Sequence, residues 1–151
     1  MKVVIFLQNA WSRLYAGGTW PRDSWLAALQ RSRSGQRLRN IEKHCKKITI
    51  WYDNTTPIVG DCPDSVIPAD LSHMRQVIEE QKPDVVVALG EQAKLCLKQL
   101  GSGPMLFLPH PAYRVVTNDL YQKAGRMISK GVTGVVELKQ EKQRVRTIKH
   151  G

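Results

Sequence analysis

Two stretches decide the fold: residues 84–93, DVVVALGEQA, and residues 105–114, MLFLPHPAYR. Each is a short apolar run that ends in a turn or a polar loop, at Gly90 in the first case and at His110 in the second. Continuous apolar runs of this length are typical of strands that are buried on both faces of a parallel sheet. Ligands bind at the strand ends of such sheets, so the position of His110 predicts a functional role.

The rest of the chain alternates strands with helices. Two further strands are predicted, at Lys2–Gln8 and Lys47–Tyr52. Apolar residues at helical spacing predict helices over residues 22–30, 70–81, 91–100 and 117–130. Ser34-Gly35, inside a basic segment, is interpreted as a turn. This alternation predicts a three-layer α/β/α fold around a mainly parallel, four-stranded sheet.

Length and charge bound the domain organisation and the partners. The chain has 151 residues, which is enough for one domain with a sizeable core. Residues 1–139 are predicted to form a single α/β domain, and residues 140–151 are predicted to form a basic, flexible tail. The net charge of +10 favours a polyanionic partner such as nucleic acid. Solubility alone is the alternative explanation of this charge.

Several classes of protein are disfavoured by the composition. No apolar run approaches the roughly 18 residues of a membrane span. The short run Met1–Leu7 does not have the pattern of a secretory signal. Cys45, Cys62 and Cys96 are far apart and form no CxxC pair, so neither a zinc site nor a disulfide framework is indicated. We therefore expect a cytoplasmic monomer with reduced thiols, no metal, no cofactor and no membrane contact.

Polar residues follow three of the predicted strands: Gln8-Asn9, Asp53-Asn54 and His110. In a parallel sheet these strand ends share one edge, so we expect the side chains to converge in one cleft. An asparagine amide can recognise the edge of a pyrimidine, because it offers both a donor and an acceptor. A neutral imidazole can donate to an oxygen on which negative charge develops. The alternatives are a turn or cap role for each asparagine and a structural role for the histidine.

The order of these residues resembles the uracil-DNA glycosylase superfamily over about residues 3–129. Pro83–Ala93 is similar to the strand and helix start that precede the family's second motif. Leu108–Ala112 resembles that motif, which is commonly written HPS. Leu7–Ala10 resembles the first motif, written GQDP or GINP, although leucine and alanine replace its glycine and proline.

Two further segments extend the resemblance. Tyr52–Asn54 with Pro57 is similar to the strand end that carries the family's base-recognising asparagine. Residues 32–38, SRSGQRL, resemble a segment with glycine and arginine that follows the first motif in small microbial and phage members. The iron–sulfur branches of the superfamily use four cysteines, so with three cysteines no cluster is expected.

The resemblance implies a mechanism in which a nucleotide is flipped out of DNA and its base is held in a pocket. His110 then hydrogen-bonds the pyrimidine O2, Asn54 recognises the base edge, and Gln8 contributes backbone contacts to the base or to a phosphate. Asn9 stands where a water-positioning residue belongs. An amide cannot take a proton as a carboxylate can, so Asn9 implies slow turnover, a special substrate or no turnover. Asp53 could supply the carboxylate, or could be a solvated or turn-capping residue.

A flipped base also needs an aromatic wall, for which Trp11, Tyr15, Trp20 and Trp25 are candidates. Trp20 is preferred because it follows Gly17-Gly18 in a predicted loop, whereas Trp25 lies on the apolar face of a predicted helix and fits the core.

Basic and aromatic side chains supply candidate DNA contacts. Arg33, Ser34 and Arg37 could bind a phosphate, or could form a solvated basic surface. Tyr113 or Arg114 stands where the family inserts a residue into the gap left by the flipped nucleotide. Either could instead cap the loop surface.

The sequence therefore predicts a metal-independent DNA glycosylase-like protein that acts on a uracil-type or modified base in duplex or single-stranded DNA. Two alternatives stay open. One is a DNA-binding protein that uses the same cleft without catalysis, and the other is a nucleotide-binding α/β domain. The net charge disfavours the second alternative more than the first.

Overall fold

The computed structural model describes residues 1–101, 103–113 and 116–140. Within these residues five strands form one parallel sheet, and five helices flank it. The strands are β1 (Lys2–Leu7), β2 (Thr49–Asn54), β3 (Val85–Leu89), β4 (Met105–Leu108) and β5 (Val135–Glu137). The helices are α1 (Arg22–Arg31), α2 (Arg33–Glu42), α3 (Leu71–Gln81), α4 (Glu91–Leu100) and α5 (Asn118–Lys130).

The strand order is β2-β1-β3-β4-β5, and every neighbouring pair is parallel. After β1 the chain turns to one side to form β2, and it then crosses to the other side of β1 to form β3. This reversal puts a topological switch point between β1 and β3, where open α/β sheets form a crevice at the carboxyl ends of their strands. The loops that follow β1 and β3 border this point.

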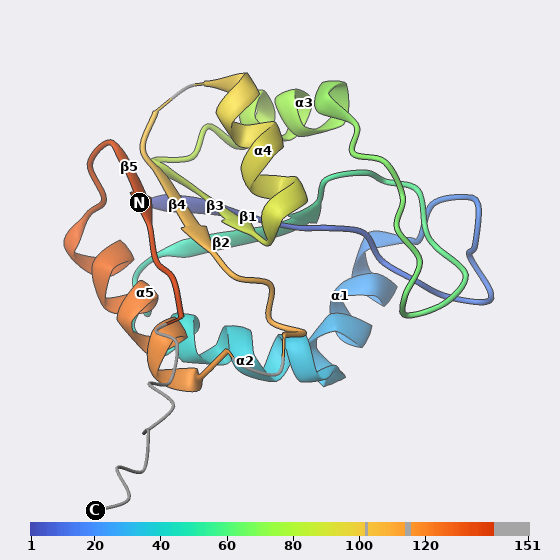
Figure 1. Cartoon of the computed structure of the whole chain (residues 1–151), viewed down its shortest axis with the longest axis horizontal. Helices are drawn as coiled ribbons and strands as arrows, with labels where there is room; N and C mark the ends of the chain where they lie inside the picture. The colour runs from blue at the N-terminus through green and yellow to red at the C-terminus, as the bar shows by residue number, and fades with distance from the viewer. Residues whose placement is uncertain (102, 114–115, 141–151) are drawn as a thin grey trace, which may run out of the picture.

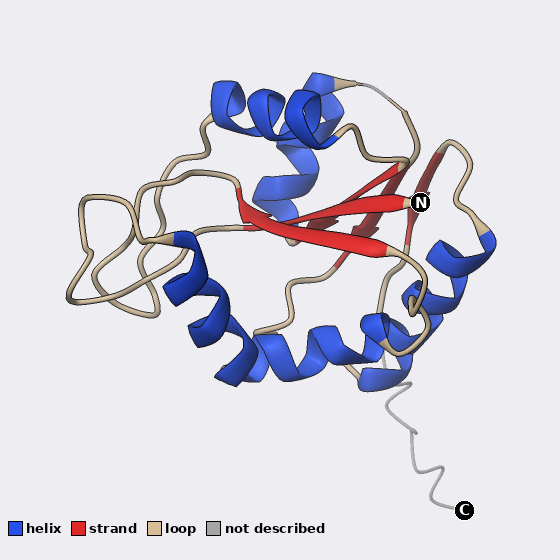
Figure 2. Cartoon of the chain, turned by 180° about the vertical axis from the view of Figure 1, so that it is seen from behind, coloured by secondary structure: helices blue, strands red, loops and turns tan. Residues whose placement is uncertain are grey.

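Helices cover both faces of the sheet, as Figures 1 and 2 show: α3 and α4 lie on one face, and α2 and α5 lie on the other. The alternation of side chains along β1 divides the core accordingly. Val3, Ile5 and Leu7 pack with α2 and α5, whereas Val4 and Phe6 pack with α3 and α4. Both faces are therefore buried, which explains the unbroken apolar sequence of the central strands.

The predicted α/β class with a parallel sheet is confirmed, but the predicted number of four strands is wrong. The fifth strand, β5, has three residues at the edge of the sheet, and Val135 and Glu137 in it are exposed. So short a segment carries too little apolar pattern to be recognised in the sequence. Gln140, the first residue of the predicted tail, accepts a hydrogen bond from the Thr117 backbone N–H at 3.0 Å. Residues 141–151 lie outside the described residues.

The interpretation of Ser34-Gly35 as a turn is wrong, because both residues lie in the first turn of α2. Ser32 caps this helix, and its Oγ accepts a hydrogen bond from the Gly35 N–H at 3.0 Å. A Cβ on Gly35 would lie 1.8 Å from the backbone oxygen of Leu29, so the glycine serves the close approach of α1 and α2. Glycine is required here because the two helices leave no room for a side chain. Local turn signals in the sequence do not reveal this requirement.

Among the described residues no helix is long and apolar enough to cross a membrane. Cys45 is buried, Cys62 is exposed, and both are free thiols, as is Cys96.

We expect Gly35→Ala to lower the free energy of unfolding by about 1–3 kcal/mol, because the new methyl group meets backbone and cannot be accommodated by a side-chain rotation. Urea unfolding measures the change. Gly18→Ala is the matched control, since the nearest atom to its Cβ would lie 3.8 Å away. Equal stabilities of the two variants would contradict this account of Gly35.

Candidate functional site

The loops that follow β1, β2 and β4, together with α1, line an open cavity of about 900 Å³ at the carboxyl edge of the sheet. Five of the side chains predicted from the sequence border it: Asn9, Trp20, Ser34, Asn54 and His110. They come from four separate parts of the chain, and the parallel sheet and the packing of α2 bring them together. The expected convergence at one edge is therefore present in the structure.

Hydrogen bonds hold the ends of β1 and β2 side by side. The backbone N–H of Thr55 donates to the oxygens of Leu7 and Gln8 at 2.9 and 3.0 Å, and its hydroxyl donates to Gln8 at 2.6 Å. Asn54, the last residue of β2, lies opposite Leu7 in the register. Its backbone is thus held in place. Asn54 is 8% exposed, and among the described residues no hydrogen bond of its side-chain amide is found, so the accessible part of the amide can meet a ligand.

The loop after β4 is held from two sides. The hydroxyl of Tyr121 donates to the backbone oxygen of Pro109 at 2.6 Å, and Arg37 Nη1 donates to the backbone oxygens of Pro111 and Tyr113 at 2.8 and 2.7 Å. His110 lies between these anchors. A Cβ on Gly90 would lie 3.3 Å from the His110 Cβ and 3.6 Å from the ring atom Cδ2, so the imidazole packs closely against the turn after β3.

The imidazole of His110 is a neutral hydrogen-bond donor. Burial lowers its pKa to about 4, so it carries no charge near neutral pH. Its Nδ1 accepts a hydrogen bond from the backbone N–H of Ala112 at 3.1 Å. The ring proton therefore resides on Nε2, to which no partner is assigned within the described part of the chain.

The side chain of Asn9 is engaged at both ends. Its Nδ2 donates to the backbone oxygen of Ala10 at 3.0 Å, and its Oδ1 accepts from the backbone N–H of Ile67 at 3.3 Å. The amide thus ties the loop after β1 to the segment that leads into α3. One N–H and one lone pair remain for a ligand or a water molecule.

The other predicted contact residues lie outside the cavity lining. Gln8 supplies its backbone oxygen to Thr55, and Arg37 is used to hold the loop after β4. Arg33 is exposed at the start of α2, and the Tyr113 side chain is 53% exposed beside His110, with 6.2 Å between ring centroids. Arg114 lies outside the described residues.

Asp53 is the centre of a charged cluster that sequence reasoning did not identify. Its carboxylate accepts from His73 Nε2 at 2.9 Å, from Trp51 Nε1 at 3.0 Å and from the Asn54 backbone N–H at 2.8 Å. Arg22 lies 3.7 Å from it and stacks on the Trp51 ring at 3.4 Å from the centroid. The closest clue to this cluster in the sequence was His73, which lies three residues after Asp70, the residue that caps α3.

The hydrogen bonds of the cluster shift the pKa values of Asp53 and His73. Burial alone would raise the pKa of Asp53, but the hydrogen bonds from His73 and Trp51 outweigh it and lower that pKa. The hydrogen bond to Asp53 raises the pKa of His73. Asp53 is therefore a partly buried, paired carboxylate, and its suggested role as a free base for the cavity is not supported by its geometry. Asp61, which the sequence analysis did not single out, is the carboxylate found among the described residues that line the main cavity.

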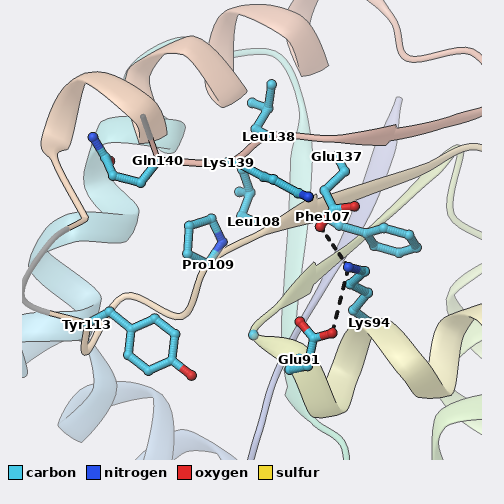
Figure 3. A pocket seen from close by; sticks show the side chains of 11 residues that line it. Glu91, Lys94, Phe107, Leu108, Pro109, Tyr113, Glu137, Leu138, Lys139 and Gln140 are labelled. Carbon is cyan, nitrogen blue, oxygen red and sulfur yellow. Dashed lines mark hydrogen bonds and ion pairs between the residues drawn. The ribbon is translucent and has the colours of Figure 1, made fainter. Parts of the chain in front are cut away.

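A second hollow, of about 260 Å³, lies on the other side of Pro109, between the start of α4 and β5 (Figure 3). Its charged groups neutralise one another, because Lys94 Nζ lies 2.7 Å from Glu137 and 3.7 Å from Glu91. The larger cavity, with an unpaired amide and a neutral imidazole donor, is thus the better candidate for a functional site.

Among the described residues, no group of three or more His, Cys, Asp or Glu side chains is placed to hold a metal ion. Comparison of the chain with protein-family models, with curated protein sequences and with solved structures finds no significant match. The functional argument therefore depends on the geometry of the site.

The lowered pKa of His110 predicts a pH dependence of stability. The unfolded state takes up a proton near pH 6.5 and the folded state only near pH 4, so acidification between these values favours unfolding. We expect this histidine to lower the free energy of unfolding by on the order of 2–3 kcal/mol over that interval. Urea titrations of the wild type and His110→Gln at several pH values isolate the effect. Parallel pH curves for the two proteins would contradict it.

Arg37 is predicted to act by holding the loop after β4. We expect Arg37→Met, which keeps the aliphatic stem, to lower the free energy of unfolding by about 2 kcal/mol through the loss of two charge-assisted hydrogen bonds. Arg33→Met removes a neighbouring exposed charge and should change it by less than about 0.5 kcal/mol. Equal free energies of unfolding for the two variants in urea would show that Arg37 does not hold this loop.

Proposed function

We propose that the protein is a DNA glycosylase-like enzyme that holds a uracil-type or modified base, flipped out of DNA, in the 900 Å³ cavity and hydrolyses its N-glycosidic bond. The observation that carries the proposal is the convergence of the Asn54 amide and the neutral His110 imidazole on that cavity. The resemblance of the motifs around Asn9, Asn54 and His110 to the uracil-DNA glycosylase superfamily supports it as well.

The chemistry of the two groups suits the proposed reaction. When the bond between C1′ of the sugar and N1 of the base breaks, the electron pair leaves with the base, and a water molecule adds to C1′ and releases a proton. His110 donates from Nε2 to the pyrimidine O2 and stabilises the departing anion, for which a neutral donor of fixed tautomer is suited. Asn54 recognises the edge of the base with its amide.

The state of Asn9 predicts modest chemical power. Its amide is already bonded to the backbone at both ends and offers one remaining donor and one remaining acceptor to a water molecule. Asp61, in the connection between β2 and α3, has an exposed carboxylate that can accept the proton released by the water. Slow turnover suits a base that unstacks easily, such as a damaged or modified one.

The proposed DNA contacts use the surface around the cavity mouth. The chain has a net charge of +10, which attracts the phosphate backbone. Arg33 and Ser34 begin α2 beside the cavity, where the partial positive charge of a helix N-terminus favours a phosphate. Tyr113 is exposed next to His110 and can stack on DNA in the gap left by the flipped nucleotide.

A second candidate function is DNA binding without turnover. The engagement of both ends of the Asn9 amide favours it, because an amide that is already bonded cannot take the proton of an attacking water molecule. The shared cavity and the same surface would serve both functions, so an assay for product decides between them.

We expect mass spectrometry to detect a released base after the protein is incubated with DNA that carries uracil, mismatched thymine or modified pyrimidines. His110→Ala should lower the rate by about 10²–10³-fold, as expected for loss of a donor to a developing negative charge. His44→Ala, a histidine outside the cavity lining, is the matched control and should leave the rate within about twofold.

Three outcomes separate the candidate functions. Release that depends on His110 and Asn54 supports catalysis. Salt-sensitive DNA binding with no released base from any DNA favours the binding function. Binding of free nucleotides with no binding of DNA contradicts both functions and leaves the nucleotide-binding alternative.

A further inference from the structure

The positive charge of the chain is concentrated on one face of the sheet. Residues 31–47, which include α2, contain seven Lys and Arg and one acidic residue, and residues 117–130, which include α5, contain three and one. Both helices cover the same face (Figures 1 and 2). Residues 70–100, which include α3 and α4 on the opposite face, contain four Lys and Arg and five acidic residues. The two helical layers therefore differ strongly in charge.

The cations on the α2 and α5 side are exposed and flank the contact between these two helices. At that contact the Gln122 amide donates to the Asn40 side-chain oxygen at 3.3 Å, and a Cβ on Gly125 would lie 2.7 Å from the backbone oxygen of Ile41. Exposed Lys and Arg residues adjoin these contact residues and continue beyond them, at Arg33, Arg39, Lys43, Lys46, Lys47, Lys123, Arg126 and Lys130. We call these residues the α2–α5 basic face.

The charge of the α2–α5 basic face is not neutralised by the protein. None of the ion pairs found within the described part of the chain includes a residue of this face. Of the two acidic residues in the same segments, Glu42 accepts a hydrogen bond from the Tyr52 hydroxyl at 2.6 Å. The other, Asp119, lies in the first turn of α5, where the helix dipole favours a carboxylate. Like charges gathered on one face repel one another, and a polyanion relieves this repulsion.

The side chains around the cations distinguish nucleic acid from other partners. A helix that binds a membrane surface inserts apolar side chains, and a protein interface has an apolar, aromatic centre that is poor in lysine. In the described chain the exposed large hydrophobic residues lie outside α2 and α5. Charge that serves solubility alone does not need to be segregated on one face. Cations without apolar anchors are typical of contacts to a phosphate backbone.

The α2–α5 basic face begins at the mouth of the main cavity. Arg33 lies between Ser32 and Ser34, which both line that cavity. From Arg33 to Lys43, α2 rises by about 15 Å. This length corresponds to about four base pairs of duplex DNA, at about 3.4 Å for each pair. DNA that reaches the cavity can therefore continue along α2 and onto α5.

We propose that the α2–α5 basic face binds the phosphate backbone of duplex DNA outside the cavity, through Lys and Arg contacts that do not depend on base sequence. This binding requires no flipped or modified base and so goes beyond the proposed function. The choice of DNA over RNA rests on that function. Backbone contacts of this kind let a protein move along DNA, so the face keeps the cavity beside the duplex before any base is flipped.

Two variants that lower the net charge by the same amount test the α2–α5 basic face. The face variant replaces two lysines and one arginine of this face: Lys43→Gln, Lys123→Gln and Arg126→Gln. The control variant replaces two lysines and one arginine that are exposed on α3, at its C-cap and on α4: Arg75→Gln, Lys82→Gln and Lys98→Gln. Urea unfolding verifies that both variants are folded.

Binding is measured by fluorescence anisotropy with a short, labelled DNA duplex that carries no modified base, at several NaCl concentrations. In the face variant we expect Kd to rise at least about tenfold near physiological salt. The slope of log Kd against log[NaCl] should fall by about three, because each lost phosphate contact removes about one from it. The control variant should keep Kd within about threefold and the slope within about one of the wild type.

Several results overturn the inference. Equal losses in the two variants would show that net charge alone acts, and an unchanged Kd in the face variant, or no binding of DNA by the wild type, would show that this face does not hold DNA. Preference of the wild type for phosphatidylserine vesicles or for an RNA duplex over DNA would show that the partner is a different one.

The same measurements separate this inference from the proposed function. His110→Ala should bind the unmodified duplex as the wild type does, because the imidazole belongs to the cavity. Loss of DNA binding in the face variant, with no base released by the wild type from any DNA, contradicts the proposed catalysis and leaves this inference intact. Base release by the wild type, with an unchanged Kd in the face variant, contradicts this inference and leaves the catalysis intact.

Discussion

The parallel pairing of β1 with β2 on one side and β3 on the other is the constraint on which the structure depends. Val3–Leu7 are at most 6% exposed, so this strand has no face in contact with solvent. A strand in that position must be apolar throughout, and its backbone must be paired along both edges. Because all the pairings are parallel, the polar residues that follow the strands gather at one edge of the sheet. The side chains of the site come together because the strands run in the same direction.

The site offers mainly hydrogen-bond donors and few groups that can accept a proton. Burial keeps His110 neutral, and a backbone N–H fixes which of its nitrogens carries the proton. The partly buried carboxylate of Asp53 is already paired with Arg22 and His73. Such a site can stabilise negative charge on a ligand more readily than it can remove a proton from water. Under the proposed function, this balance favours tight recognition with slow chemistry.

The sequence predicted those parts of the site that depend on strand direction. Asn9, Asn54 and His110 each follow an apolar run, so their convergence required only that the strands be parallel. The partners of Asp53 and the role of Arg37 could not be predicted in the same way. Arg37 and Pro111 are 74 residues apart, and Asp53 and His73 are 20 apart. No local pattern of charge or hydrophobicity encodes such pairs, because they arise from how α2 and α3 pack on the sheet.

The amino-acid sequence by itself determined the α/β class, the buried central strands and the carboxyl edge as the location of the polar groups, since hydrophobic periodicity and chain direction are local properties. The tertiary structure decided the rest. Contact between α1 and α2 requires Gly35 inside a helix where a turn was expected. Stacking of Trp20 on Tyr15 decides how this ring is held beside the cavity. Burial and pairing depend on distant segments, so they emerge only when the chain is folded.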